Sequence, residues 1–273
     1  MSVVIVTYNK PKDVTEAVES LSNQSVKPFE VIVIDDGSNP HQSIEFRIQN
    51  LKFIRFNQEV GLSNARNYGI KVAKGELIAF IDDDGLAERN WIEEIQKGLD
   101  SADVIGGSIK PLYQASPPEW WNEKDFGAKV GVCNVLSTGV KIWGCNMAFR
   151  TEVFRMIGLF NPNLGRRKGK LFSFEETDII NRARSKGFNA QFIPAAVVYH
   201  KVPPRRMTIG YIARWNYYLG RSLKLIEGFQ PLKSFVDLLL VIAVMASPRK
   251  IFAEKPTRIK NIGRMAYYLG RLF

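Results

Sequence analysis

Three consecutive carboxylates, Asp82 to Asp84, follow the short apolar run 77–81. That run has the length and composition of one buried strand. Side chains alternate along an extended chain, so Asp82 and Asp84 should face one side and Asp83 the other. Two carboxylates on one side offer the oxygen ligands that a hard divalent cation requires, and such a cation is commonly shared with substrate phosphates. Taken alone, the stretch could also be an acidic turn or a helix N-cap before Glu88.

A second acidic pair, Asp35 and Asp36, also follows a strand-like run, and the elements around both groups explain why they should meet. The pattern predicts strands at 3–6, 30–34, 52–56, 77–81 and 104–109, alternating with amphipathic helices at 12–23, 61–74 and around 91–99. This alternation favours a parallel, doubly wound sheet. Ligands of such sheets bind at the carboxyl ends of the strands, where both acidic groups fall.

The motifs that the sequence lacks argue against several classes of nucleotide-binding protein. No G-x-G-x-x-G follows the first strand, which argues against a dinucleotide-binding oxidoreductase, and no G-x-x-x-x-G-K-[ST] occurs, which excludes a P-loop. The first turn also lacks the glycine-rich loop expected of a sugar-nucleotide pyrophosphorylase. What remains is a fold that binds a nucleotide with carboxylates and meets its diphosphate through a metal.

Seven segments in order resemble the successive motifs of the family 2 inverting glycosyltransferases, which have the GT-A fold. They are Val3–Asn9, Val33–Ser38, Ala65–Ile70, Phe80–Asp84, Gly144–Arg150, Glu175–Ile179 and Val197–His200. The resemblance covers about residues 1–200. It implies an α/β fold of GT-A type, Rossmann-like, with a mostly parallel sheet flanked by helices. It also implies a metal-dependent enzyme that moves a sugar from a nucleotide-sugar donor to a hydroxyl acceptor in polysaccharide, lipid-linked or cell-envelope glycan synthesis.

The resemblance assigns the nucleotide to the first two strand ends. Asp36 would accept the N3–H of uracil or thymine, and a carboxylate there would reject cytosine, which lacks that donor. Asp35 would lie beside it, and the remaining nucleotide-binding candidates are Thr7, Tyr8, Arg66, Asp82 and Asp83. The alternatives are a turn aspartate that binds backbone amides at Asp36 and a surface salt bridge at Arg66.

The resemblance also implies a metal site. Asp84 would ligate Mn²⁺ or Mg²⁺, with Asp82 on the ribose or on a metal-bound water and His200 as a distal ligand or diphosphate contact. The cation would neutralise the departing nucleoside diphosphate. A structural role is the alternative for His200, which is one of only two histidines in the chain.

The general base implied by the resemblance is Glu176. The family usually has Glu-Asp where this chain reads Glu175-Glu176, so the carboxylate here carries one more methylene. Glu175 and Asp178 are the other catalytic candidates. Ser173 is predicted to cap a helix that starts here and ends at Gly187, and acidic residues favour a helix N-terminus in any case.

The acceptor side is predicted from two segments. Trp143, Gly144, Cys145 and Asn146 resemble the segment that lines this side in the family. Residues 111–140 are predicted to form a long irregular excursion, which in a compact domain is usually functional. Trp120 and Trp121 in this excursion would stack on a sugar or anchor the loop.

The net charge of +11 is unevenly distributed along the chain. Residues 1–200 balance 24 Lys and Arg against 24 Asp and Glu, whereas residues 201–273 hold 14 against 3. We therefore predict a catalytic domain at 1–202 and a basic, aromatic, amphipathic helical extension at 203–273. A basic tail on a neutral domain implies an anionic partner surface, and the carboxylate set favours a membrane over nucleic acid.

The extension also contains a repeat, because 212–221 and 262–271 match at seven of ten positions. The apolar run 235–246 between the copies is too short to span a bilayer. We expect the extension to form amphipathic helices on an anionic membrane. The alternative is that the repeated helices pack on the catalytic domain or on a second subunit as a homodimer.

The cysteines and the N-terminal residues indicate in which cellular compartment the protein is expected. Cys133 and Cys145 are the only cysteines, and we expect free thiols in a reducing compartment. Ser2–Val6 shows no charged leader. The expected location is cytoplasmic, peripheral to the inner face of the membrane. The rival function is a catalytically inactive nucleotide-sugar or glycan-binding module of the same fold.

Overall fold

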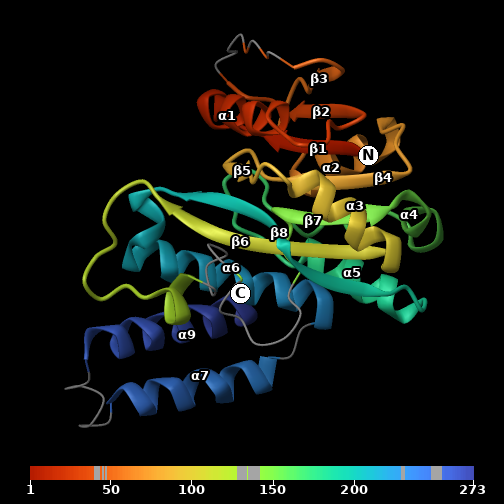
Figure 1. The fold of residues 1–273 in the computed structure, drawn as a ribbon. Coiled ribbons are helices and arrows are strands. Elements are labelled where there is room, and N and C mark those ends of the chain that lie inside the picture. The colour runs from red at the N-terminus through yellow and green to blue at the C-terminus, as the bar shows by residue number, and fades with distance from the viewer. Residues whose placement is uncertain are drawn as a thin grey trace.

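The computed structural model describes residues 1–39, 44, 46, 48–127, 134, 142–228, 231–246 and 254–273. Eight strands form one sheet in the order β3-β2-β1-β4-β7-β6-β8-β5 (Figure 1). They are β1 (Ser2–Thr7), β2 (Glu30–Asp35), β3 (Leu51–Arg55), β4 (Leu77–Ile81), β5 (Gly85–Ala87), β6 (Val104–Tyr113), β7 (Asn146–Arg150) and β8 (Ala190–Val202). The α-helices are α1 (Pro11–Ser22), α2 (Leu62–Val72), α3 (Trp91–Ser101), α4 (Thr151–Ile157), α5 (Glu175–Ser185), α6 (Ile209–Glu227), α7 (Pro231–Ala246) and α9 (Lys255–Leu272).

The first half of the sheet confirms the pattern of strands and helices predicted from the sequence. β1 pairs in parallel with both β2 and β4, and β2 pairs in parallel with β3. The second half differs from a doubly wound sheet, because β7 is antiparallel to β4 and β6, and β5 is antiparallel to β8. β6 itself pairs in parallel with β8, so this half of the sheet is mixed.

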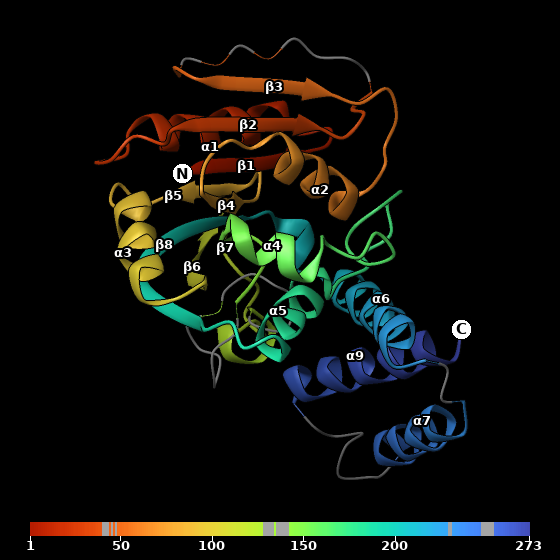
Figure 2. The ribbon, with the colours of Figure 1, turned by 90° about the vertical axis from the view of Figure 1, so that its right-hand side faces the viewer.

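The sheet separates two apolar layers because side chains alternate along each strand. On one face, Val3 and Ile5 pack with α1 and α3. On the other, Val4 and Phe80 pack with residues of α2, α4 and α5, the three helices that Figure 2 shows in front of and beside the sheet. Phe80 lies edge to face with Phe160, with ring centroids 5.6 Å apart. This two-sided burial makes the sheet a rigid platform for its loop edges.

Two local predictions were wrong. Ser173 does not cap α5: its hydroxyl donates to the Leu171 carbonyl, and Phe174, with φ 74°, forms the turn into the helix. The stretch 111–140 is not wholly irregular, because β6 extends to Tyr113 and Glu123–Gly127 forms a π-helical turn. Most of residues 128–141, including Gly131 and Cys133, lie outside the described residues.

The predicted extension contains α6, α7 and α9. α6 and α9 carry the two copies of the repeat and run in the same direction (Figure 2). A Cβ at Gly220 would lie 2.0 Å from the Tyr267 carbonyl oxygen, and one at Gly270 would lie 1.9 Å from that of Tyr217. The repeated glycines therefore let the two helices cross in backbone contact. In the described part of the chain, none of the helices is long and apolar enough to cross a membrane.

Candidate active site

Strand pairing brings the second acidic group against a distant histidine. β5 follows Asp84 directly and pairs with β8 so that Gly85 lies opposite His200. The backbone N–H of Lys201 donates to the Asp84 carbonyl over 2.9 Å. This antiparallel pairing, which the sequence pattern does not predict, holds the Asp84 and His200 side chains together.

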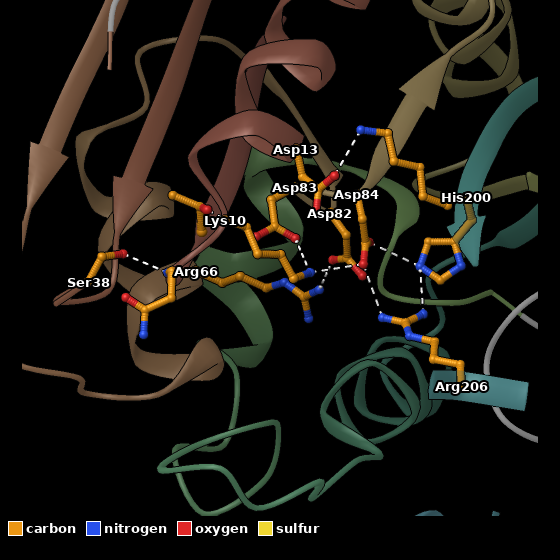
Figure 3. A network of polar contacts seen from close by, with 12 residues as sticks. Lys10, Asp13, Ser38, Arg66, Asp82, Asp83, Asp84, His200 and Arg206 are labelled. Carbon is orange, nitrogen blue, oxygen red and sulfur yellow. Dashed lines mark hydrogen bonds and ion pairs between the residues drawn. The ribbon is translucent and has the colours of Figure 1, made fainter. Parts of the chain in front are cut away.

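Asp84 is the most heavily contacted carboxylate of the site (Figure 3). Its Oδ1 lies 3.1 Å from His200 Nε2, and its Oδ2 accepts from Lys10 Nζ at 2.9 Å and from Arg206 Nη2 at 3.0 Å. Burial alone would raise the pKa of Asp84, but its three neighbours outweigh burial and hold that pKa well below its usual range. Asp84 is therefore ionised at neutral pH.

Asp83 lies in the turn after β4, where strand alternation no longer applies, and it shares Lys10 with Asp84. It accepts from the Thr7 hydroxyl at 3.0 Å and from Lys10 Nζ at 2.8 Å. Burial raises the pKa of Asp83 to about 6, against the lowering effect of Lys10. Two nucleotide-binding candidates, Thr7 and Asp83, thus contact each other at the end of β1.

Arg66 joins the strand-end carboxylates to α5. It donates to Asp82 Oδ1 at 3.0 Å, to Glu175 Oε1 at 2.9 Å and to the Gly144 carbonyl at 3.1 Å. Its side chain is buried, so the structure places it inside a network of acidic groups and not in a surface salt bridge.

Both residues of the first acidic pair, Asp35 and Asp36, also accept hydrogen bonds. Asp36 accepts the backbone N–H groups of Val60 and Gly61, one on each oxygen, at 2.8 and 2.9 Å. Asp35 accepts from Ser38 N at 2.9 Å and pairs with Arg55 at 3.2 Å. Burial raises the pKa of Asp36 to about 6, although its two backbone hydrogen bonds lower it. Each oxygen of Asp36 keeps a lone pair for a further donor.

A cavity of about 990 Å³ lies beside these groups. Asp82, Glu175 and Glu176 line it, together with Trp143, Gly144 and Cys145. Burial and the adjacent Glu175 raise the pKa of Glu176 to about 8, so this carboxyl holds a proton near neutral pH.

Several predicted site residues lie elsewhere. Asp178 is not in the cavity lining and pairs with Arg182 at 2.9 Å. Asn146 is buried and donates to the carbonyls of Ser108 and Ala196, which ties β7 to β6 and β8. Trp121 is buried and stacks on Phe126, as expected of a hydrophobic anchor, and the half-buried Trp120 packs beside it. Tyr8 is 40% exposed at the end of β1.

The comparison with known families decides the class of protein. Residues 2–158 match the profile of Glycosyl transferase family 2. The chain belongs to this family. The match ends before α5. The prediction that Glu176 is the general base therefore rests on the resemblance of its motif and on its position in the cavity.

Relatives of this family 2 glycosyltransferase act in glycan synthesis. It is 27% identical over 266 residues to glucosyl-dolichyl phosphate glucuronosyltransferase of Haloferax volcanii, covering 89% of this chain and 84% of the relative. It is 24% identical over 237 residues to the succinoglycan biosynthesis protein ExoM of Rhizobium meliloti, covering 80% and 72%. The enzyme is thus a glycosyltransferase of glycan or polysaccharide synthesis.

Solved structures establish the GT-A fold. The mannosyltransferase PcManGT of Pyrobaculum calidifontis, in complex with GDP-Man and Mn²⁺, has a TM-score of 0.62 at 17% identity, covering 99% of this chain and 85% of that one. TarS 1-349 of S. aureus with UDP has a TM-score of 0.53 at 19% identity, covering 98% and 89%. Of these two neighbours, PcManGT was solved with Mn²⁺ bound.

The donor set of the family 2 enzyme fits such a cation. Asp82, Cys145 and His200 each offer a ligand atom within 4.8 Å of the others, and Asp84 lies against His200. Carboxylate oxygens and an imidazole nitrogen suit Mn²⁺. Lys10 and Arg206 supply positive charge to Asp84 at the same place.

Sequence reasoning missed Lys10 and Arg206 in the family 2 site. Lys10 comes directly after the first motif, three residues beyond the end of β1, so the strand-end rule could have found it. Arg206 lies six residues after His200, and its contact with Asp84 depends on a turn at Pro204–Met207. Arg166 lines the cavity and lies over the Trp215 ring of α6. Only the position of α6 reveals that contact.

Proposed function

We propose that this enzyme is an inverting, metal-dependent hexosyltransferase that moves a sugar from a UDP- or dTDP-linked donor to a hydroxyl of a glycan or lipid-linked acceptor. The observation that carries the proposal is that Glu176, with a pKa raised to about 8, lines the same cavity as Asp82. A carboxylate that retains a proton near neutral pH suits proton transfer better than one that is always ionised.

The donor base would bind at the ends of β1 and β2. Asp36 would accept the N3–H of uracil or thymine with a lone pair that Val60 and Gly61 leave available. The two amides orient the carboxylate before the nucleotide arrives. Thr7, Asp35 and the exposed Tyr8 would complete this pocket.

Asp84 and His200, with Asp82 beside them, would hold Mn²⁺ or Mg²⁺ next to the diphosphate. When bound, this cation would neutralise the negative charge of the leaving nucleoside diphosphate. Lys10 and Arg206 lie within reach of the same place, and their ammonium and guanidinium groups would turn from Asp84 to the diphosphate oxygens. Arg66 would keep Asp82 and Glu175 in fixed relative positions.

Glu176 would accept the proton of the acceptor hydroxyl. The acceptor oxygen would then attack the anomeric carbon from the face opposite the diphosphate, and the bond between that carbon and the diphosphate oxygen would break. One displacement of this kind inverts the anomeric configuration. Trp143 to Cys145 would line the acceptor side of the reaction.

The cavity continues between α5 and the helices α6 and α9, where Ile180, Ile212 and Leu219 give it apolar walls. Arg184 and Arg264 add positive charge to the lining, and neither forms an ion pair with another described residue. These walls suit an acceptor with an apolar chain and an anionic group. The name of the Haloferax volcanii relative, which specifies a dolichyl phosphate substrate, supports the same class. We accordingly propose a cytoplasmic enzyme, peripheral to the membrane.

Calorimetry and activity together test the proposal. Nucleotide-sugar binding should be much tighter with Mn²⁺ than with EDTA, and Asp84→Ala should remove that difference together with sugar transfer. Asp13→Asn, in an ion pair away from the cavity, is the control. Equal affinity with Mn²⁺ and EDTA would contradict the metal role. Metal-dependent binding without any transfer or hydrolysis would favour an inactive binding module.

A further inference from the structure

Helix α7 is apolar on two opposite sides. On the inner side, Leu238 and Val241 are buried where α7 packs on α9. On the outer side, six large apolar side chains have exposed fractions between 44% and 76%: Leu232, Phe235, Val236, Leu239, Leu240 and Ile242. We call these six residues the outer face of α7.

The outer face lacks a cover within the part of the chain that the structure describes. α7 lies at the edge of the molecule farthest from β3, and both views show it with only α9 beside it (Figures 1 and 2). A helix that is apolar all round is normally enclosed by protein or lipid. Large exposed apolar patches on monomers usually mark interaction surfaces.

Positive charge flanks the outer face at both ends. Lys233 lies in the first turn of α7 and is exposed. Lys255 and Arg258 are exposed at the start of α9, which Figure 1 places beside the end of α7. None of the three forms an ion pair with another described residue. The arrangement is therefore an apolar helix with one cationic group in its first turn and two more beside its last turn.

We propose that the outer face of α7 is the surface by which the protein docks on an anionic lipid bilayer, with α7 in the plane of the membrane. Phe235, Leu239 and Leu240 enter the boundary between headgroups and acyl chains, and the flanking cations bind lipid phosphates. Each Lys or Arg near such a surface contributes roughly 1 kcal/mol. A second copy of the chain fits less well, because each tail carries 14 basic against 3 acidic residues and the two would repel.

The crossing of α6 and α9 makes this surface a rigid part of the enzyme. Gly220 and Gly270 allow backbone contact between these helices, and α6 and α9 both line the cavity. α7 is fixed to α9 through Leu238 and Val241. Docking through α7 thus fixes the orientation of the cavity relative to the bilayer, whichever sugar the enzyme transfers.

Flotation of the full chain with vesicles tests the inference. The protein should float with vesicles of phosphatidylcholine and phosphatidylglycerol, less so as salt is added, and poorly with phosphatidylcholine alone. The double variant Leu239→Glu, Leu240→Glu should lower binding to anionic vesicles at least tenfold. The control is Met156→Glu, which places a single glutamate at a 62% exposed apolar residue of α4.

Thermal unfolding and nucleotide binding of each variant distinguish a docking defect from a folding defect, and they also separate this inference from the proposed transfer activity. The inference is overturned if the wild type does not float, if it floats equally well with neutral vesicles, or if the double variant floats like the control. A solution dimer that the double variant abolishes, measured by sedimentation equilibrium, would assign the face to a second copy instead.

Discussion

Two carboxylate groups, one after β4 and one at the start of α5, reach the cavity through Asp82 and through Glu175 and Glu176, and their charges are compensated very differently. Asp82 to Asp84 lie among Lys10, Arg66, His200 and Arg206, so that each carboxylate has at least one cationic or imidazole partner. Of Glu175 and Glu176, only Glu175 forms an ion pair within the described part of the chain, and its partner is Arg66. The first group therefore stays ionised at Asp84, whereas Glu176 keeps a proton up to a pH of about 8.

This difference shows how one cavity can contain two kinds of acid chemistry. A carboxylate surrounded by positive charge is suited to hold a cation, because its proton is already displaced. A carboxylate beside another carboxylate, with little compensation, is suited to take up a proton. The contrast gives four predictions, from the largest expected effect to the smallest.

Glu176→Gln removes the carboxylate that we expect to accept the proton. We expect transfer to fall about 10²–10⁴-fold, because the amide cannot accept the hydroxyl proton. Donor binding should stay near the wild-type value, since Glu176 does not contact the strand-end carboxylates. Steady-state kinetics and calorimetry measure the two quantities. Asp178→Asn is the matched control on the same helix, and full turnover in Glu176→Gln would move the base to another residue.

Arg66→Met removes the one cation that both groups share. Asp82 and Glu175 would lose a buried partner, and breaking such a pair costs about 3–5 kcal/mol in the free energy of unfolding. Urea unfolding measures this cost. Lys97→Met, which removes an exposed pair with Glu93 and Glu94, should leave the free energy of unfolding nearly unchanged, because water screens such pairs. Similar costs for both variants would show that Arg66 does not support the site.

Asp36→Asn extends the contrast to a carboxylate whose partners are backbone amides. We expect uridine diphosphate to bind about 10–100-fold more weakly, since a hydrogen bond to a charged group contributes about 1.5–3 kcal/mol. In the wild type, affinity should also fall as the pH drops through about 6, because protonation of Asp36 removes the acceptor. Calorimetry at several pH values checks both effects. Unchanged binding in the variant would exclude Asp36 from the base pocket.

The pH dependence of turnover tests the raised pKa of Glu176 without a mutation. A general base must be deprotonated to act, and burial raises the pKa of Glu176 to about 8. We therefore expect kcat/KM to rise about tenfold per pH unit below 8 and to level off above it. The residual activity of Glu176→Gln should lack this slope. A profile that is flat from pH 6 to 9 would contradict the raised pKa.

Much of the first half of the molecule is readable from the sequence. Leu77–Ile81 and Glu30–Asp35 are strands because short apolar runs rich in β-branched residues have few other stable environments. Because strands and helices alternate here, β2 and β4 run in the same direction. Asp36 and Asp84 follow the ends of these strands and therefore lie at the same edge of the sheet. The motifs around them, with those of β7, α5 and β8, also predicted the family, which the profile match confirms over residues 2–158.

The later half depends on contacts that no local pattern encodes. Phe174 forms the turn before α5 in place of the expected Ser173 cap, and the Ser173 N–H donates to the hydroxyl of Ser222 in α6. Asn146 looks like an acceptor residue in its motif, yet its amide bridges three strands. The repeat in α6 and α9 indicated a pair of helices, but only their packing shows that the glycines are the crossing point.

By itself, the sequence determined the alternation of strands and helices, the two acidic strand ends and the basic, aromatic character of the last 73 residues. These are properties of neighbouring residues, which periodicity and charge express directly. Only the tertiary structure decided that Arg206 reaches Asp84, that Arg66 links Asp82 to Glu175, and that α7 leaves one apolar side exposed. Each of these depends on how strands and helices far apart in the chain pack against one another, and packing is selected by the burial of the whole core.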